Sequence, residues 1–418
     1  MSFTKISQFS GLSKDIWILA ITSFINKFGS MVIPFLTIYL RTGLKFTYVE
    51  IDFIMVFLGL GTICGNFFSS KVSDAIGFYK TMMLSLSCTG IMFIILGNIT
   101  TFYGVCAMIF FITCTSDLFR PAMLTFIKLN TNKENSTKAL ALYRTADNLG
   151  FLFGPTLGGL VLLYNQTNLL FWCDGISCLV AVLFFMITIK EKKVPFKLKE
   201  VRKDLNPISI LSDRPYMLHL IITLITGILF FQIFVTVPIY NEEILKIPNY
   251  SNGFFLSGYA LILVVFEFPI VSYITKKNIN RIKVIALGQV SMIIGFSCLL
   301  LNSAEGLVLM LIFISFGVIF TYPFSVSFAM SRSNKYMVAK YMAIISISYS
   351  VARVISSTVG TGIIAKYGFN QNWICMIALG TLGFILSLRL HKIILKEQTQ
   401  IQNDIVSSIF QSNTKTDL

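Results

Sequence analysis

The chain is organised as apolar runs of about 20 residues that alternate with short polar joints. A helix of that length crosses the ~30 Å hydrocarbon core of a bilayer. Because 55% of the residues are hydrophobic and only 13% are charged, an ordinary soluble domain is excluded. We predict an all-α polytopic membrane protein. Its twelve transmembrane helices are expected at approximately 15–40, 47–70, 80–99, 103–127, 139–164, 168–189, 215–240, 251–275, 284–302, 306–330, 341–365 and 370–390.

Basic residues are concentrated in alternate joints. With the amino terminus placed in the cytoplasm, 26 of the 34 lysines and arginines fall in cytoplasmic joints or termini, and only Arg41, Lys45, Lys246 and Lys366 fall on the other side. This asymmetry follows the positive-inside rule and predicts both termini in the cytoplasm, in an inner or plasma membrane. The net charge of +15 therefore indicates topology, and we expect no nucleic-acid partner.

A charged joint at about 190–214 divides the runs six and six. Small residues followed by Tyr, a polar turn and Trp recur at 158–172 and 360–373, which favours two pseudo-symmetric six-helix bundles. Halves of this kind are typical of alternating-access transporters. The predicted parts are an N-terminal bundle at 1–189, a cytoplasmic central loop at 190–214, a C-terminal bundle at 215–392 and a disordered cytoplasmic tail at 393–418.

Cysteine and histidine give no sign of a metal site, a disulfide framework or a catalytic centre. All eight cysteines lie within predicted spans, and the two histidines, His219 and His391, are far apart in the sequence. The sequence contains no phosphate-binding loop of the Gly-x-x-x-x-Gly-Lys-Ser/Thr type. We therefore expect no metal, no cofactor and no enzymatic activity, and an energy source other than ATP.

One apolar segment carries glycines at four-residue spacing. Gly150, Gly154 and Gly158 lie on one face of a helix, and Pro155 and Gly159 lie beside them. In lipid, small residues on one face let a second helix approach closely, and the proline tends to bend its helix. The simpler interpretation is a kinked, tightly packed helix, and the functional one is a conformational motif.

Four charged residues fall at mid-depth in the fourth and fifth runs, namely Asp117, Arg120, Arg144 and Asp147. With a rise of about 1.5 Å per residue, Arg120 and Asp147 lie about 12–13 Å from the cytoplasmic ends of consecutive helices. Within each run, the acid and the arginine share one face. We predict a four-charge cluster that either exchanges a proton through one carboxylate or acts as a static lock between the two helices.

Three further charged residues, Lys27, Glu267 and Arg353, reach mid-depth in other runs. Glu267 lies near Pro269 and is a second candidate for proton coupling. Alternatively, Glu267 is a buried carboxyl that desolvation keeps neutral. Lys27 and Arg353 are candidates for a substrate cavity. The remaining cavity candidates are polar or aromatic residues within the runs, Asn26, Asn148, Gln232, Phe231, Phe234 and Tyr240.

In its twelve runs and its glycine segment, the chain resembles the major facilitator superfamily, and within it the twelve-span drug:H+ antiporters. The resemblance covers residues 14–392 at the level of topology. In that family the fifth span has spaced glycines that end in Gly-Pro-x-x-Gly-Gly, which Gly154, Pro155, Gly158 and Gly159 match here. The resemblance implies that this face packs against another helix and helps to set the geometry of exchange.

A second match lies in the joint between the second and third spans. The family pattern there is Gly-x-Leu-x-Asp-Arg-x-Gly-Arg-Lys/Arg, in which Asp74 and Gly77 match and Lys80 lies one position beyond the basic pair. The first glycine and both arginines are replaced. Asp74, Gly77 and Lys80 are therefore candidates for a conformational motif that lacks the family's full set of charges.

The resemblance implies a secondary active transporter that exports a small amphiphilic or drug-like compound in exchange for protons by alternating access. One alternative is proton-coupled uptake of a sugar, a carboxylate or another nutrient by the same fold. The other is a membrane receptor that transports nothing. For a transporter, the partners are the lipid bilayer, a small-molecule substrate and protons, and we expect a monomer.

Overall fold

The computed structural model describes residues 12–131, 136–164, 166–189, 212–248, 250–332 and 338–413, and no strand occurs within these ranges. The N-terminal half consists of α1 (Lys14–Phe28), α2 (Val32–Ile38), the π-helical turn η2 (Tyr39–Gly43), α3 (Tyr48–Ile76), α4 (Phe78–Leu96), α5 (Phe102–Ser116), α6 (Phe119–Leu129), α7 (Ser136–Leu163) and α8 (Thr167–Thr188). The C-terminal half consists of α11 (Arg214–Glu243), α12 (Ser251–Lys276), α13 (Arg281–Leu299), α14 (Ala304–Arg332), α15 (Val338–Tyr367) and α16 (Phe369–Asn413).

In the described part of the chain, eleven segments are long and apolar enough to cross a membrane. The first of them combines α1, α2 and η2, and the fourth combines α5 with the start of α6. α15 takes the place of the eleventh span in the chain order, although its serines, its threonines and Arg353 make it less apolar. The predicted all-helical fold with twelve spans is confirmed.

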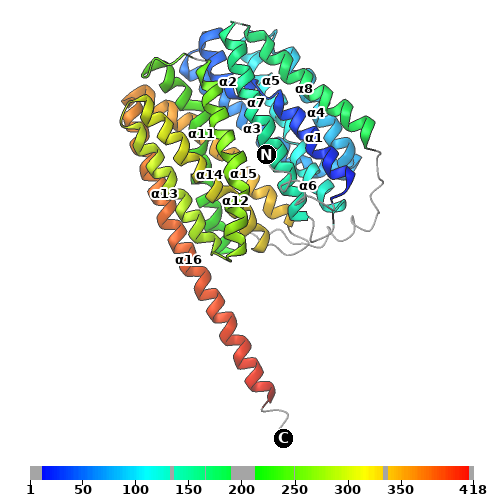
Figure 1. Ribbon diagram of the computed structural model, residues 1–418, viewed down its shortest axis with the longest axis vertical. Helices are drawn as coiled ribbons and strands as arrows, with labels where there is room; N and C mark the ends of the chain where they lie inside the picture. Colours follow the sequence, from blue (N-terminus) through cyan, green and yellow to red (C-terminus); the bar gives the residue numbers. More distant parts are fainter. Residues whose placement is uncertain are drawn as a thin grey trace.

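The two halves lie side by side, and each has its own apolar core (Figure 1). They meet where α7 packs against α12, α3 against α15 and α2 against α11. We call the end of the bundle at which α1 begins, and from which α16 projects, the terminal end (Figure 1). The other end is called the opposite end.

The first span is broken between α1 and α2. The carboxylate of Asp174 in α8 accepts hydrogen bonds from the backbone N–H groups of Met31 and Val32, at 3.2 and 3.0 Å. Asp174 is buried, in the interior of the N-terminal half. An unsatisfied backbone group in hydrocarbon costs several kcal/mol, so this carboxylate makes the break tolerable.

The fourth span is broken between α5 and α6 because Pro121 lacks a backbone donor and its ring collides with the preceding turn. Hydroxyl groups of neighbouring helices bind the carbonyl groups that the break exposes. Ser85 of α4 donates to the carbonyl of Thr115 at 2.7 Å, and Ser69 of α3 donates to that of Leu118 at 3.0 Å. Both broken spans therefore keep their backbone satisfied through side chains of the same half.

α16 is a single helix of 45 residues, and its carboxyl-terminal part projects beyond the bundle (Figure 1). The polar composition predicted a disordered tail from residue 393, whereas the helix continues to Asn413. A physical reason is that no glycine or proline interrupts residues 384–413. Residues 414–418, and positions 190–211 of the predicted central loop, lie outside the described residues.

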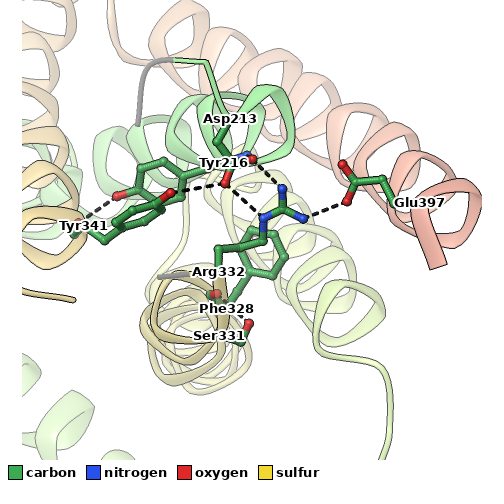
Figure 2. A network of polar contacts seen from close by, with 7 residues as sticks. All are labelled: Asp213, Tyr216, Phe328, Ser331, Arg332, Tyr341 and Glu397. Atoms are coloured by element: carbon green, nitrogen blue, oxygen red, sulfur yellow. Dashed lines mark hydrogen bonds and ion pairs between the residues drawn. The ribbon is translucent and has the colours of Figure 1, made fainter. Parts of the chain in front are cut away.

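An ion network joins four helices of the C-terminal half at the terminal end (Figure 2). Arg332 of α14 binds Asp213 through Nη2 at 2.6 Å and Nε at 3.1 Å, and binds Glu397 of α16 through Nη1 at 2.7 Å. Asp213 also accepts the backbone N–H of Tyr216 at 3.2 Å, which caps the start of α11. The hydroxyl of Tyr341 in α15 lies 3.4 Å from the same carboxylate. Arg332 thus connects the beginning of the half to its last helix.

We expect Arg332→Gln to lower the stability of the protein in detergent by about 1–3 kcal/mol, because the half-buried carboxylate of Asp213 loses a two-point partner. The measurement is thermal unfolding followed by intrinsic fluorescence. The matched control is Arg281→Gln, since the hydrogen bond of Arg281 among the described residues goes to a backbone carbonyl, that of Ser327. Equal unfolding temperatures for the two variants would contradict the expected role of the network.

Candidate functional site

The glycine face of α7 lies directly against the first span. A Cβ atom added to Gly150 would lie 2.7 Å from the backbone oxygen of Phe24, and one added to Gly154 would lie 2.9 Å from that of Lys27. A Cβ on Gly158 would similarly meet the ring of Phe35 at 2.6 Å. Larger residues would force the two helices apart, so the four-residue spacing is what allows α7 to pack at the break in the first span.

Gly159 faces α12 of the C-terminal half. A Cβ atom on Gly159 would lie 2.4 Å from the backbone oxygen of Tyr250 and 3.4 Å from the Cα atom of Gly253. A Cβ atom on Gly253 would in turn lie 2.2 Å from the backbone oxygen of Pro155. α7 is therefore held between the first span and α12, and its polar residues lie where the halves meet.

Arg144 of α7 forms an ion pair with Glu267 of α12. The Nδ2 atom of Asn148, one turn further along α7, donates to the other carboxylate oxygen of Glu267 at 3.1 Å. Glu267 is only 8% exposed, and such a buried carboxylate is stable in its charged form only when it is paired. These three side chains form a bridge between the halves at mid-depth, which we call the α7–α12 bridge.

A second polar connection between the halves involves Tyr322 of α14. The guanidinium of Arg120 in α6 donates to the hydroxyl of Tyr322. The guanidinium carbons of Arg120 and Arg144 lie 5.7 and 5.0 Å from the centroid of the same ring, within the range of cation–π attraction. Tyr349 of α15 lies next to it, with ring centroids 5.5 Å apart. Two arginines of the N-terminal half thus converge on aromatic residues of the other half.

The four charged residues of the fourth and fifth runs have partners that differ from the predicted cluster. Arg144 pairs with α12 rather than with its neighbours, and Asp147 accepts a hydrogen bond from Ser23 of α1 at 2.8 Å. Asp117 lies at the break between α5 and α6, where Arg353 of α15, Arg120 and Lys27 are close enough to interact with it electrostatically. The reason for the difference is the close packing of α7 on α12, which brings a carboxylate of the other half within reach of Arg144.

Three of the predicted cavity residues are occupied in helix packing. Gln232 is buried and donates to the backbone and hydroxyl oxygens of Ser356 at 3.1 and 2.9 Å. Tyr240 is buried with its ring edge-on to Trp373. The side-chain oxygen of Asn26 accepts a hydrogen bond from a cysteine thiol of α8 at 3.2 Å. These side chains stabilise the interior of each half, where they face neighbouring helices.

Other predicted cavity residues lie nearer to the meeting of the halves. Phe234 packs against Phe151 of α7 with ring centroids 6.3 Å apart, and Arg353 lies 4.7 Å from the ring centroid of Phe231. Lys27 lies on the last turn of α1, next to the glycine face of α7. Of these residues, Phe234 makes an aromatic contact between the halves, while Lys27 lies on the side of α7 that packs against α1.

The weaker predicted motif lies at the turn between α3 and α4. Gly77 has a φ angle of +90°, which residues with a side chain rarely adopt, and Lys80 is exposed in the first turn of α4. The side chain of Asp74 lies outside the described residues. The positive φ angle at this turn is therefore a sufficient reason for glycine at position 77.

Further contacts join the halves toward the opposite end. Thr156 of α7 donates to Ser257 of α12 at 2.5 Å, and Thr361 of α15 donates to Asp52 of α3 at 2.5 Å. Tyr48 donates to a glutamate at the end of α11. Together with the α7–α12 bridge, these contacts join the halves from the opposite end to mid-depth.

Tyr322, Tyr349 and Ser23 were not predicted as site residues. Each is an uncharged residue in an apolar run, so neither charge nor glycine spacing distinguishes it. Tyr322 does precede Pro323, just as Glu267 lies near Pro269. A polar residue beside a proline within a run is the signal that would have identified Tyr322.

The family model of the Major Facilitator Superfamily matches residues 16–357 of this chain. The uncharacterized MFS-type transporter YttB of Bacillus subtilis (strain 168) is 22% identical over 372 residues, which cover 87% of this chain and 91% of YttB. The uncharacterized MFS-type transporter YuxJ of the same organism is 26% identical over 187 residues. That match covers 42% of this chain and 45% of YuxJ, so it spans less than half of either protein.

The solved structures point to the same fold. The crystal structure of the nucleoside transporter NupG superimposes with a TM-score of 0.71, covering 91% of this chain and 100% of that one. The sequence identity is 13%, so this likeness concerns the fold alone. Because the family model covers most of the sequence, this chain belongs to the Major Facilitator Superfamily.

Proposed function

We propose that this protein is a proton-coupled secondary transporter that gives alternating access to a site between its two halves. The observation that carries the proposal is the α7–α12 bridge, in which a buried carboxylate of one half is paired with an arginine of the other. An ionisable residue in the membrane interior is costly and is associated with proton or ion pathways. A proton is the smallest ligand that can change the strength of such a bridge.

Protonation of Glu267 removes its negative charge and with it the Coulomb attraction to Arg144. The bridge is then reduced to hydrogen bonds, and the two halves are freed to separate at mid-depth. Loss of the proton restores the attraction and favours the closed arrangement of α7 and α12. The proton therefore biases an equilibrium between two arrangements of the halves, as a coupling ligand must.

We propose that the terminal end faces the cytoplasm, in an inner or plasma membrane, because the basic joints cluster on that side of the sequence. In this orientation the described arrangement is closed toward the outside by the contacts of α7, α12, α3 and α15. The exposed side chain of Arg120 is then accessible from the cytoplasmic side.

The direction that we propose is export of a small amphiphilic compound in exchange for protons. The support is the glycine segment of α7, whose close packing on both the first span and α12 suits the antiporter motif that it resembles. Phe231, Phe234 and Phe151 add aromatic surface at the meeting of the halves, which suits an amphiphile.

Proton-coupled uptake of a carboxylate is a second candidate. The specific observation in its favour is the convergence of Arg120 and Arg144 on Tyr322, which places two guanidinium groups around one position. Guanidinium groups bind carboxylates well. The two candidates differ in whether substrate and proton move in opposite directions or together.

We expect Glu267→Gln to uncouple transport in proteoliposomes. The probes are the cationic dye ethidium, neutral glucose and the carboxylate 1-naphthoate, each tested with and without an imposed pH gradient. For the transported probe, gradient-driven flux should fall roughly 5- to 150-fold, while exchange of probe for probe persists because exchange needs no change of charge at Glu267.

The matched control is Glu305→Gln, which neutralises an exposed acid at the opposite end. Gradient-driven flux that is equal in the wild type and in Glu267→Gln would remove Glu267 as the proton carrier. Movement of the probe against the proton supports export, and movement with the proton supports uptake.

We expect Gly159→Leu to prevent closure toward the opposite end, because the added side chain would collide with the Tyr250 backbone. The measurement is disulfide cross-linking between cysteines introduced at Thr156 and Ser257, whose hydroxyl oxygens are 2.5 Å apart. Cross-linking should be slower by roughly tenfold or more in the Gly159→Leu background, which corresponds to about 1.4 kcal/mol. In Gly362→Leu, where a Cβ atom meets open space, it should be unchanged. Equal rates in both backgrounds would show that the contact at Gly159 does not control closure.

A further inference from the structure

We infer that Arg120, Arg144 and Tyr322 form a binding site for the anionic group of a soluble organic substrate, such as an aromatic carboxylate. The inference rests on the uptake candidate of the proposed function, because it assigns a substrate class to that transport pathway. It concerns the arginines rather than the proton carrier, so it can fail or succeed separately.

Arg120 has donor capacity that the protein leaves unused. Its described partner is the hydroxyl of Tyr322, and it takes part in no ion pair among the described residues. A guanidinium carries five N–H donors, more than one phenol oxygen can accept. Arg120 is also exposed, unlike a structural arginine enclosed by partners. Arg120 can therefore bind an oxyanion without breaking an existing ion pair.

Tyr349 supplies an additional donor at the same place. Its hydroxyl oxygen is buried and has no hydrogen-bond partner among the described residues. Both Arg120 and Arg144 are close enough to interact electrostatically with this hydroxyl. A buried hydroxyl without a hydrogen-bond partner costs free energy. An oxyanion between the two arginines would accept a hydrogen bond from the hydroxyl of Tyr349.

The depth of the site argues for a soluble anion and against a lipid headgroup. Arg120 lies about 12 Å along its helix from the terminal end, whereas lipid headgroups lie at the ends of the spans. Phe151, which lies seven residues after Arg144 on α7, packs against Phe234 of the other half and provides apolar surface further along the same interface. The best match is a small amphiphile with one negative end.

Glu267 would compete with this ligand for Arg144, since both are anions that bind the same guanidinium. The other charged or titratable groups around the pair are Arg120 of α6, Tyr143 and Asp147 of α7, Tyr259 of α12, Tyr322 of α14 and Tyr349 of α15. Protonation of Glu267 ends the competition, so proton and anion strengthen each other's binding. For an anionic substrate, movement of the two together follows, as the uptake candidate requires.

The test measures binding to the full-length protein in non-ionic detergent by thermal stabilisation. Three probes share one ring system and differ in charge: 1-naphthoate, 1-naphthalenemethanol and 1-naphthylmethylammonium. We expect 1-naphthoate to stabilise the protein most. Its affinity should fall roughly tenfold or more in Arg120→Gln and in Arg144→Gln, and should stay unchanged in the control Arg281→Gln.

Glu267→Gln is expected to change the affinity for 1-naphthoate in the direction opposite to the arginine variants. Removal of the competing carboxylate should strengthen 1-naphthoate binding by roughly tenfold, although it breaks a contact between the halves. Tyr322→Phe alters no charge and should weaken 1-naphthoate binding by a smaller factor than the arginine variants. If an arginine variant fails to fold, Tyr322→Phe still tests the site. Binding in detergent needs no proton gradient, so this result is independent of the flux measurements.

Preferential stabilisation by the ammonium probe would overturn the inference. So would weaker 1-naphthoate binding in Glu267→Gln, or the absence of any stabilisation by 1-naphthoate at millimolar concentration. If binding behaves as expected while Glu267→Gln leaves gradient-driven flux intact, the anion site stands and proton coupling through Glu267 fails.

Discussion

The short distance between the backbone of α7 and its two neighbours determines where the charged side chains of this protein lie. In lipid, helices gain little from excluding apolar surface, so they associate through close van der Waals contact and buried polar bonds. The glycines of α7 permit that contact on one side with the first span and on the other with α12. Arg144 and Asn148 reach Glu267 because the two helices are this close. A larger residue at Gly159 would collide with the backbone of Tyr250 at the start of α12.

The requirement that backbone polar groups be satisfied in hydrocarbon shapes the rest of the N-terminal half. Both broken spans are stabilised by side chains of neighbouring helices, through Asp174 in one case and serine hydroxyls in the other. Charged residues lie next to both breaks. Lys27 lies just before the first break, and Asp117 lies at the second. Irregular backbone and mid-membrane charge therefore occur together, as they do where membrane proteins line a pathway.

Much of this architecture is predictable from the sequence because length, hydropathy and charge asymmetry are properties of single helices. They identify the spans, the division into halves and the residues at mid-depth. Pairing between halves depends on which helices become neighbours, and the pattern within one run contains no such information. The sequence therefore predicts partners for Arg144 within its own half, although its partner is Glu267 of the other half. Gln232 and Tyr240 make hydrogen bonds within their own half for a related reason, because a polar group in an apolar run is compatible with an internal partner as well as with a cavity.

The long last helix links the C-terminal half to the space outside the membrane. About 30 Å of hydrocarbon requires about 20 helical residues, so less than half of the 45 residues of α16 is needed for crossing. Glu397 ties the helix to Arg332 near the point where it leaves the bundle, and the helix continues from there to Asn413. The projecting part of α16 is therefore a continuous helical extension that moves with the C-terminal half. When that half tilts, each residue of the extension is displaced by an amount that grows with its distance from the bundle. A small rotation inside the membrane therefore moves the end of α16, outside the membrane, the furthest.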